Sequence, residues 1–305
     1  MATERISISS VCRQLGYSKQ AYYKSLHRRH KRDCHKMAAR NHVLSIRRQM
    51  PRIGTRKLHY LLKDVFAREQ IALGRDGLFD LLRAEGLLIN RKRKYVKTTN
   101  SKHWMHKYSN LLTDLQVTAP EQVWVADITY IGVGKGYAYL HLITDAYSKK
   151  IMGYRLSDNL SAAASVEALK MALKNRKHSY PLIHHSDRGL QYCSLLYTKL
   201  LQQHAIGISM TQDGSPYDNA IAERVNGILK DEFAIDEVFD NMQQASDVIK
   251  NSIGIYNQQR PHFSNHLLTP NQMHQQNILK PKAWRKKTTR TFEGSCGFLP
   301  SLSKL

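Results

Sequence analysis

The sequence predicts two structural classes in one chain of 305 residues: an all-helical amino-terminal region and a larger α/β domain. Up to about residue 90, apolar residues recur at the three- and four-residue spacing of helices. From Gln122 onward, short apolar runs bounded by tight turns alternate with helical segments, which is typical of a mixed sheet flanked by helices. The charge also changes here, because residues 1–120 contain 26 Lys and Arg against 8 Asp and Glu, whereas residues 121–280 contain 15 of each.

The formal net charge of +23 narrows the choice of binding partners. Because positive charge lies on both sides of a neutral middle segment, the flanks are suited to a polyphosphate such as DNA. A ribosome-associated protein, or a merely soluble basic one, would have a similar balance. A membrane surface is a weaker candidate, since no basic amphipathic helix stands out.

The cysteines suggest a reducing compartment. Cys12, Cys34, Cys193 and Cys296 are scattered and form no CxxC pair, which argues against a structural zinc site and against a disulfide framework. No signal peptide is recognisable, and no apolar stretch approaches the ~18–20 residues of a membrane helix. We therefore expect a cytoplasmic protein.

Residues 1–32 are predicted to form a helix-turn-helix unit. A first helix near residues 8–15 is followed by a turn at Gly16, and Ser18 is a suitable N-cap for a second helix that begins at Lys19. A helical hairpin without a DNA role has the same pattern. The DNA-binding interpretation is favoured by an adjoining basic run, whose candidate contacts are Arg28, Arg29, Lys31 and Arg32.

Residues 36–97 are predicted to form a second helix-turn-helix-like DNA-binding module. We expect one helix near Lys36–Gln49, a second from Thr55 and a third from Arg75, each with an apolar stripe and a basic outer face. The basic run that follows is either a wing on DNA or a solvated charge run. The candidate phosphate contacts in this module are Arg56, Lys57, Arg91, Lys92, Arg93 and Lys94. Residues 98–121 lack periodicity and are predicted to be a linker.

The α/β domain is predicted to span residues 122–280, and a basic carboxyl-terminal tail spans residues 281–305. Its periodicity predicts a mixed five-stranded sheet with helices on both faces. The expected strands are 122–133, 137–145, 149–156, 181–187 and 206–210. The expected helices are 161–177, 193–204 and one after Pro216.

Three carboxylates in this domain are candidate metal ligands. Asp127 lies on the first expected strand, Asp187 ends the fourth, and Glu223 follows after 35 intervening residues, on the last helix. If the two strands are neighbours, Asp127 and Asp187 meet in one cleft, and Glu223 is expected over the same end of the sheet. Hard cations such as Mg²⁺ prefer such oxygen ligands. Helical geometry places Glu223 opposite the apolar stripe, on a face shared with Asn219, Asn226, Gly227 and Lys230.

Several sequence blocks resemble those of a known family. The segments Trp124–Tyr130, His185–Tyr192 and Pro216–Arg224 resemble the three catalytic blocks of DDE transposases, which belong to the retroviral integrase superfamily and have a ribonuclease-H-like fold. The segment Tyr256–His262, with Thr269-Pro270 after it, resembles the downstream block of the same family. The set is similar to the main transposase reading frame of the bacterial insertion-sequence group typified by insertion sequence three, whose helix-turn-helix modules the amino-terminal units also resemble.

The resemblance implies a DNA strand-transfer enzyme. Asp127, Asp187 and Glu223 align with the catalytic and metal-binding triad, expected to hold Mg²⁺ or Mn²⁺, as two ions. In the implied reaction, water frees a 3′-hydroxyl at an element end, and that hydroxyl attacks target DNA. The aligned positions near the triad are His185, Gln191, Tyr192, Asn219, Asn226 and Lys230. Further expected phosphate contacts are Arg188, Arg260, Arg285, Lys286 and Lys287.

The resemblance also implies partners. We expect the terminal inverted repeats and target DNA as ligands, a homo-oligomer on that DNA, and a nucleoid-associated location in a bacterium. In the family an upstream frame supplies a further helix-turn-helix and a leucine zipper. This chain has no sustained heptad pattern, so an upstream partner is an open expectation. Two other functions remain: a DNA-binding regulator with an inactive core, and a ribonuclease-H-like nuclease that cuts without joining.

Overall fold

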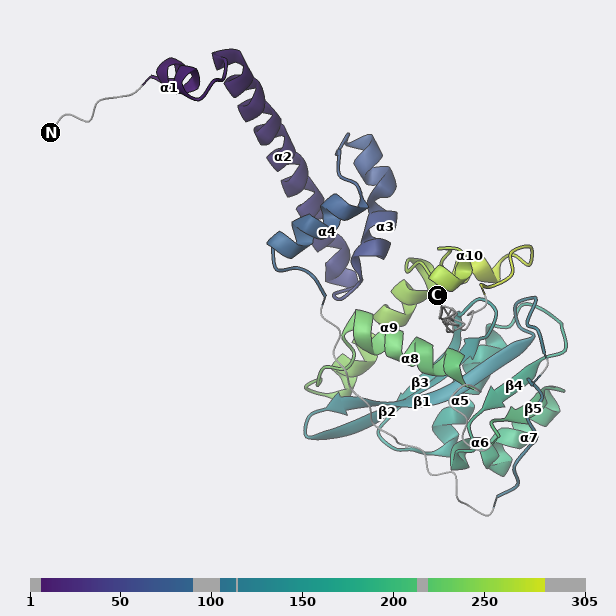
Figure 1. Ribbon diagram of the computed structural model, residues 1–305. Coiled ribbons are helices and arrows are strands. Elements are labelled where there is room, and N and C mark those ends of the chain that lie inside the picture. Colours follow the sequence, from purple (N-terminus) through teal and green to yellow (C-terminus); the bar gives the residue numbers. More distant parts are fainter. Residues whose placement is uncertain (1–6, 90–104, 114, 213–218, 283–305) are drawn as a thin grey trace, which may run out of the picture.

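The computed structural model describes residues 7–89, 105–113, 115–212 and 219–282. It has the expected two parts, an all-helical amino-terminal region and an α/β domain (Figure 1). None of the helices in these ranges is long and apolar enough to cross a lipid bilayer. The amino-terminal helices are α1 (Ile8–Gln14), α2 (Lys19–Gln49), α3 (Thr55–Arg68) and α4 (Arg75–Ala84).

Helix α2 differs from the sequence prediction, because it runs without a break for 31 residues through the boundary expected between residues 32 and 36. The segment contains neither Gly nor Pro, so nothing interrupts its backbone hydrogen bonds. It starts as expected, where Gly16 turns the chain with φ +73° and the Ser18 side chain accepts a hydrogen bond from the Ala21 amide. The first half of α2 extends away from the rest of the molecule, with α1 at its far end (Figure 1).

The second half of α2 packs with α3 and α4 into a three-helix module. The helices share apolar side chains that are almost completely buried, namely Ala39, Val43, Leu58, Leu62, Leu78 and Leu82. Leu residues three and four positions apart lie on one face of each helix, which explains why each short helix buries one stripe.

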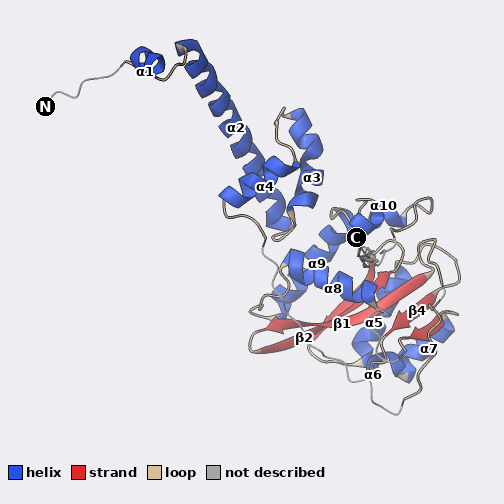
Figure 2. Cartoon of the chain, viewed as in Figure 1, coloured by secondary structure: helices blue, strands red, loops and turns tan. Residues whose placement is uncertain are grey.

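The α/β domain contains one five-stranded mixed sheet, as expected (Figure 2). Its spatial order is β3-β2-β1-β4-β5. Strand β1 pairs antiparallel with β2 and parallel with β4, so it lies at the centre of the sheet. The strands are β1 (Val123–Val133), β2 (Gly136–Asp145), β3 (Ile151–Ser157), β4 (Ile183–Ser186) and β5 (Gly207–Met210).

Helices cover both faces of the sheet. Three helices lie between β3 and β5 in the chain, namely α5 (Ala162–Lys174), α6 (Leu190–Cys193) and α7 (Leu195–Gln203). After β5 follow α8 (Ala220–Phe233), α9 (Met242–Gln258), the 3₁₀ helix η1 (Phe263–Asn265) and α10 (Pro270–His274). Trp124 and Ile143 pack with α5 and α7 in one core, whereas Ile131 and Leu140 pack with α8 and α9 in another. The helix expected at 193–204 corresponds to α7, and Ser194, whose extended backbone ends the short α6 before it, caps α7.

Part of the expected linker packs against the α/β domain. Residues 105–113 and 115–121 contain no helix or strand. The Ser109 carbonyl nevertheless accepts a hydrogen bond from the Met210 amide, and the Leu111 amide donates to Ser209 Oγ at 2.9 Å. This segment therefore lies along the edge of the sheet beside β5.

Candidate catalytic centre

Asp127 and Asp187 are brought together by the strand register. Val125 of β1 pairs with His185 of β4 in the parallel ladder, and each acid lies two residues further along its chain. Because positions two apart on a strand face the same side, Asp127 lies on the face on which Val123 and Val125 pack against Ala222 of α8. Asp187 directly follows β4, as predicted. Asp127 lies within β1, opposite Leu142 of β2, and so stands inside the sheet.

Glu223 comes from the first turn of α8, the helix that covers this face. Ala222 and Val225 of the same helix are buried, whereas the Glu223 side chain is exposed. Ala222 packs with Val123 and Val125 of β1, which holds the start of α8 over the strands that carry the other two acids. A carboxylate in the first turn is also favoured by the helix dipole.

The electrostatics of Asp127 reflect its burial and the charges of the other two acids. Burial, together with the charge of Asp187 and more weakly that of Glu223, raises the pKa of Asp127 to about 7. Hydrogen bonds from Asn226 and from the Ile128 amide oppose this shift. Because a like charge destabilises a carboxylate, the site favours either a proton or a cation at Asp127.

Two asparagines connect α8 to β1, namely Asn219 at its N-cap and Asn226 within the helix. Asn226 Nδ2 donates to Asp127 Oδ2 at 2.7 Å, and Asn219 Nδ2 donates to the Ala126 carbonyl at 3.0 Å. Both asparagine side chains are buried against β1, whereas the Glu223 side chain is exposed. Asn219 is the N-cap residue of α8, but its side chain makes no capping hydrogen bond and is bound to β1 instead.

A tight turn after β4 orients Asp187. The Gly189 amide donates to Asp187 Oδ1 at 3.0 Å. A Cβ atom on residue 189 would lie 3.0 Å from Asp187 Oδ1 and 3.0 Å from Gln191 Oε1. A side chain there would displace at least one of these groups, so Gly189 is a site residue that the sequence reasoning missed.

The other positions expected near the site lie around this centre. His185 is buried, and its Nδ1 is 2.8 Å from Ser209 Oγ. Gln191 Nε2 donates to the Leu160 carbonyl. Tyr192 is buried against His184 and Tyr197, and burial, with nearby charges including Asp187, raises its pKa well above the usual value. Lys230 lies on α8, two turns beyond Glu223, and is partly exposed.

The donor set fits a hard divalent cation. It consists of three carboxylates, and the buried Oδ1 of Asn226, whose amide contacts Asp127, has no hydrogen-bond partner in the described part of the chain. All are oxygen donors, as Mg²⁺ requires. The side chains are not assembled as ligands, however. Within the described ranges, no group of three or more His, Cys, Asp or Glu side chains is close enough to hold a metal ion.

The expected DNA contacts fall into distinct classes. Arg188, beside the centre, is partly exposed. Five candidate contacts on α2 and α3 have exposed side chains, namely Arg28, Arg29, Lys31, Arg32 and Arg56. Seven further candidates lie outside the described residues, namely Arg91, Lys92, Arg93, Lys94, Arg285, Lys286 and Lys287.

The expectation that Lys57 and Arg260 contact phosphate is wrong for this structure. Arg260 is 1 % exposed, and its guanidinium donates to both carboxylate oxygens of Glu232, at 2.9 and 2.7 Å. Lys57 is 7 % exposed, and its Nζ lies 2.5 Å from Glu232 Oε1. Glu232 lies seven residues after Val225, which places it on the apolar stripe of α8. A charged residue on an apolar stripe indicates a buried ion pair.

The downstream block that contains Arg260 fastens α9 to the sheet. Asn257 both accepts from the Ile151 amide and donates to the Ile151 carbonyl, each at 3.0 Å, so its side chain pairs with the edge of β3. The Tyr256 hydroxyl donates to the Lys149 carbonyl at 2.7 Å. These contacts support the sheet rather than the three acids.

A second buried polar cluster lies away from the three acids. His274 of α10 contacts Glu121 at 3.1 Å and Ser148 at 3.0 Å, and Asp145 at 3.7 Å. Ser148 also donates to Asp145, at 2.6 Å. All four side chains are at most 2 % exposed. No motif indicated this cluster, since its members are spread over more than 150 residues of sequence.

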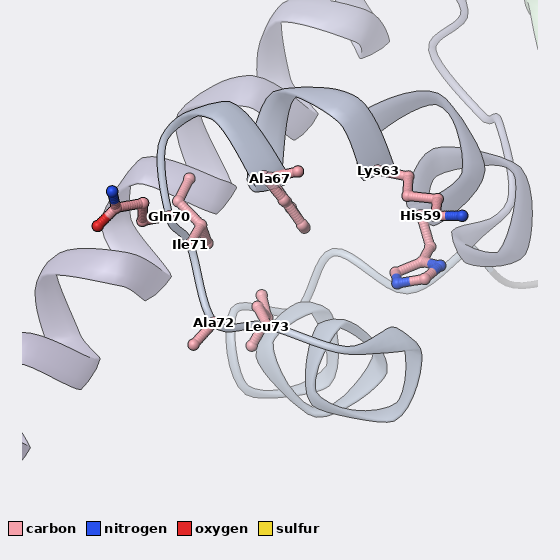
Figure 3. Close-up of a pocket in the computed structure, with 8 residues that line it drawn as sticks. His59, Lys63, Ala67, Gln70, Ile71, Ala72 and Leu73 are labelled. Atoms are coloured by element: carbon pink, nitrogen blue, oxygen red, sulfur yellow. The ribbon is translucent and has the colours of Figure 1, made fainter.

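A shallow pocket of about 320 Å³ lies between α3 and α4, in the amino-terminal module (Figure 3). Its lining includes His59 and Lys63 on α3, and Gln70 and Leu73 after it. It contains none of the three acids, so it is not part of the candidate catalytic centre.

Comparisons with known proteins place the chain in a family. Two models of the integrase core domain match residues 117–216 and 204–270. An uncharacterised 31 kDa protein of insertion element IS600 from Shigella sonnei is 37% identical over 258 residues, which cover 83% of this chain and 93% of that protein. The transposase of insertion sequence element IS629 from Shigella sonnei is 30% identical over 74% of this chain and 77% of that protein.

A further relative comes from another organism. The transposase InsF of insertion sequence IS3fB from Escherichia coli strain K12 is 35% identical over 199 residues, which cover 65% of this chain and 69% of that protein. The matched integrase core spans the strands and helix that hold Asp127, Asp187 and Glu223. The chain therefore belongs to the DDE transposases of bacterial insertion sequences, within the retroviral integrase superfamily.

Proposed function

We propose that this protein catalyses metal-dependent DNA cleavage and strand transfer at the ends of an insertion sequence. The proposal is supported by the placement of Asp127 and Asp187 on or directly after two neighbouring parallel strands, and of Glu223 on the helix that packs over them. The raised pKa of Asp127, caused by burial and then by the charges of Asp187 and Glu223, marks a place where negative charge needs compensation.

Two of the three acids have separate supports within the proposed site. Asn226 and the Ile128 amide fix the two oxygens of Asp127, and the Gly189 amide fixes one oxygen of Asp187. Divalent cations held by these carboxylates would activate the attacking oxygen and neutralise the leaving oxygen of an in-line phosphoryl displacement. Since the attacking group is water or a DNA hydroxyl, no Ser, Tyr or Cys nucleophile of the chain is required.

The basic amino-terminal region would supply DNA binding. Its exposed Arg and Lys side chains would contact phosphates, which position DNA without reading its sequence. Within the three-helix module, α4 follows the turn after α3, as a recognition helix does in a helix-turn-helix. At least two protomers are needed to pair two element ends, so we expect an oligomer on DNA.

A strand-transfer assay tests this function. The full-length protein is incubated with Mg²⁺, a target plasmid and a labelled, precut duplex end taken from the DNA that flanks the gene. The proposal predicts a joined product. Cleavage of an uncut end without joining would indicate a nuclease instead, and a mobility shift with neither reaction would indicate a DNA-binding regulator.

A further inference from the structure

Glu232 lies at a buried junction between the amino-terminal module and the catalytic helix. Its Oε1 accepts from Lys57 Nζ at 2.5 Å and from Arg260 Nη2 at 2.7 Å. The Glu232 backbone carbonyl accepts from the Arg52 amide at 3.0 Å. Lys57 belongs to α3 of the module, whereas Arg260 follows α9 of the α/β domain. One carboxylate thus binds both parts of the chain.

Two ion pairs surround this junction. Arg52, in the turn between α2 and α3, contacts Asp236 at 2.6 Å and Glu237 at 2.5 Å. Lys57 Nζ also lies 5.8 Å from the centre of the Phe263 ring. The Lys57, Glu232 and Arg260 side chains are 9 %, 12 % and 2 % exposed, so water screens them little.

Apolar packing is continuous across the same junction. One cluster of buried side chains includes Ile53 and Leu58 from the module together with Phe233, Ile235 and Tyr256 from the α/β domain. Apolar packing alone tolerates small slides, whereas the Lys57–Glu232 pair and the two ion pairs of Arg52 cross the junction and fix direction and register. The module is therefore held in one position relative to α8.

Helix α8 connects this junction to the chemistry. Glu223 and Glu232 lie on the same helix, nine residues apart, which is about 14 Å along the axis at 1.5 Å per residue. A helix of 14 residues packed on a sheet transmits a displacement of one end to the other. DNA bound by α3 and α4 is thereby placed relative to Glu223.

On the basis of the function proposed above, we propose that Lys57 and Glu232 are positioning residues that set which phosphodiester of a bound element end reaches the three acids. The pair acts through α8 and does not touch DNA. Loss of the Lys57 charge leaves the Arg260–Glu232 pair intact and loosens the module alone. The expected consequence is cleavage at neighbouring phosphates rather than loss of DNA binding.

The test maps cleavage positions on an end-labelled duplex at single-nucleotide resolution. Lys57→Met keeps the length of the side chain and removes its charge. We expect this variant to bind the end as the wild type does, to cut at several adjacent positions, and to lose about 100-fold in rate at the native position, since a displacement of about 1 Å can have that effect. Lys57→Arg should restore the native position.

Lys170→Met is the matched control, because Lys170 is exposed on α5, on the opposite face of the sheet. If Lys57→Met does not fold, Glu232→Asp replaces it, since this change keeps the charge and withdraws the carboxylate by one methylene. The proposal is overturned if the variant that folds cuts only at the native position and at the wild-type rate. Failure of the proposed function is a different result, since the wild type itself would then not cut.

Discussion

Asp127 is the carboxylate on which the candidate centre depends most. It lies inside the central strand, with Asp187 beside it and Glu223 above it, and burial and these charges raise its pKa to about 7. Asn226 is the side chain that holds one of its oxygens, from the helix that carries Glu223. Helix α8 thus brings both a third acid and an orienting amide to the same strand.

Asn226→Ala should lower the strand-transfer rate by about 10- to 100-fold and raise the Mg²⁺ concentration at half-maximal rate, because residues that orient a metal ligand typically contribute that much. Initial rates measured over a Mg²⁺ series give both quantities. Asn251→Ala, on the exposed side of α9, serves as the control. An unchanged rate and metal dependence in Asn226→Ala would remove Asn226 from the site.

Mg²⁺ or Mn²⁺ should stabilise the protein through the same acids. At a cation concentration about 100-fold above Kd, binding to the folded state alone contributes about 2.7 kcal/mol, or roughly 5–10 °C in Tm for a domain of this size. Differential scanning calorimetry would show this rise in the wild type and in Asp158→Asn, an exposed acid outside the site. An equal rise in Asp127→Asn would place the bound cation elsewhere.

At this scale the sequence predicted the acids and placed Asn226 near them, but not the contact that Asn226 makes. The three motif blocks gave Asp127, Asp187 and Glu223 together, because each block keeps a local pattern. The contact of Asn226 with Asp127 joins residues 99 positions apart, and no local pattern indicates it. Arg260 was misassigned because a basic residue in a basic protein gives no local sign of a buried carboxylate partner.

At the scale of elements, short polar junctions hold the helices on the sheet. His274 of α10 contacts Glu121, Asp145 and Ser148 at the carboxyl end of β2. Burial opposes a charge on His274, but its contacts with Asp145 and Glu121 outweigh burial and raise the pKa. Burial likewise opposes the charge of Glu121, but His274 and the amides of residues 177 and 178 outweigh it and lower the pKa.

These shifts predict the pH dependence of stability. The charge of His274 contributes fully to the free energy of unfolding below its ordinary pKa of 6.5, and this contribution is lost as pH rises through the raised pKa of the folded state. The charge of Glu121 contributes fully to the same free energy above its ordinary pKa of 4.5, and this contribution is lost as pH falls through the lowered pKa of the folded state. The difference in unfolding free energy between wild type and His274→Gln should therefore be largest between about pH 4.5 and 6.5.

Urea unfolding at several pH values measures this difference, with His204→Gln, on the exposed surface, as the control. A difference that stays constant from pH 4 to pH 9 would contradict a charged His274 in the folded protein.

The periodicity of the sequence predicted the elements better than their ends. All five strands were expected, because alternating or continuous apolar runs are long relative to the turns between them. Continuity of α2 was missed, since the basic run at 28–32 resembles a domain boundary, although nothing in it breaks a helix. The short helix α6 was not predicted, because four residues are too few to show a helical period.

At the scale of the whole molecule, the exposed basic side chains and the three acids lie in different parts of the chain. The exposed basic side chains of α2 lie on the helix that extends from the three-helix module, whereas the acids lie in the neutral α/β domain (Figure 1). The relative placement of these parts was not predictable, because it depends on contacts such as Lys57–Glu232, which joins residues 175 positions apart.

We expect the affinity for DNA to fall steeply as the salt concentration rises, because the exposed basic side chains of α2 would contact phosphates. Each phosphate contact contributes about 0.9 to the slope of log K against log [salt], so replacing Arg28, Arg29, Lys31 and Arg32 by Ala should reduce the slope by about 3 to 4. Fluorescence anisotropy over a salt series measures it, with Lys170→Ala/Lys174→Ala on α5 as the control. An unchanged slope would exclude this part of α2 from the DNA interface.

The central claim is that Asp127, Asp187 and Glu223 together perform DNA strand transfer. The most direct measurement compares the wild type with Asp127→Asn, Asp187→Asn and Glu223→Gln on a labelled precut end with Mg²⁺, alongside end binding by mobility shift. A metal centre contributes several kcal/mol to the transition state, so each variant should lose roughly 1,000-fold or more in joined product while binding the end as the wild type does. Joining at the wild-type rate by any of the three variants would contradict the assignment.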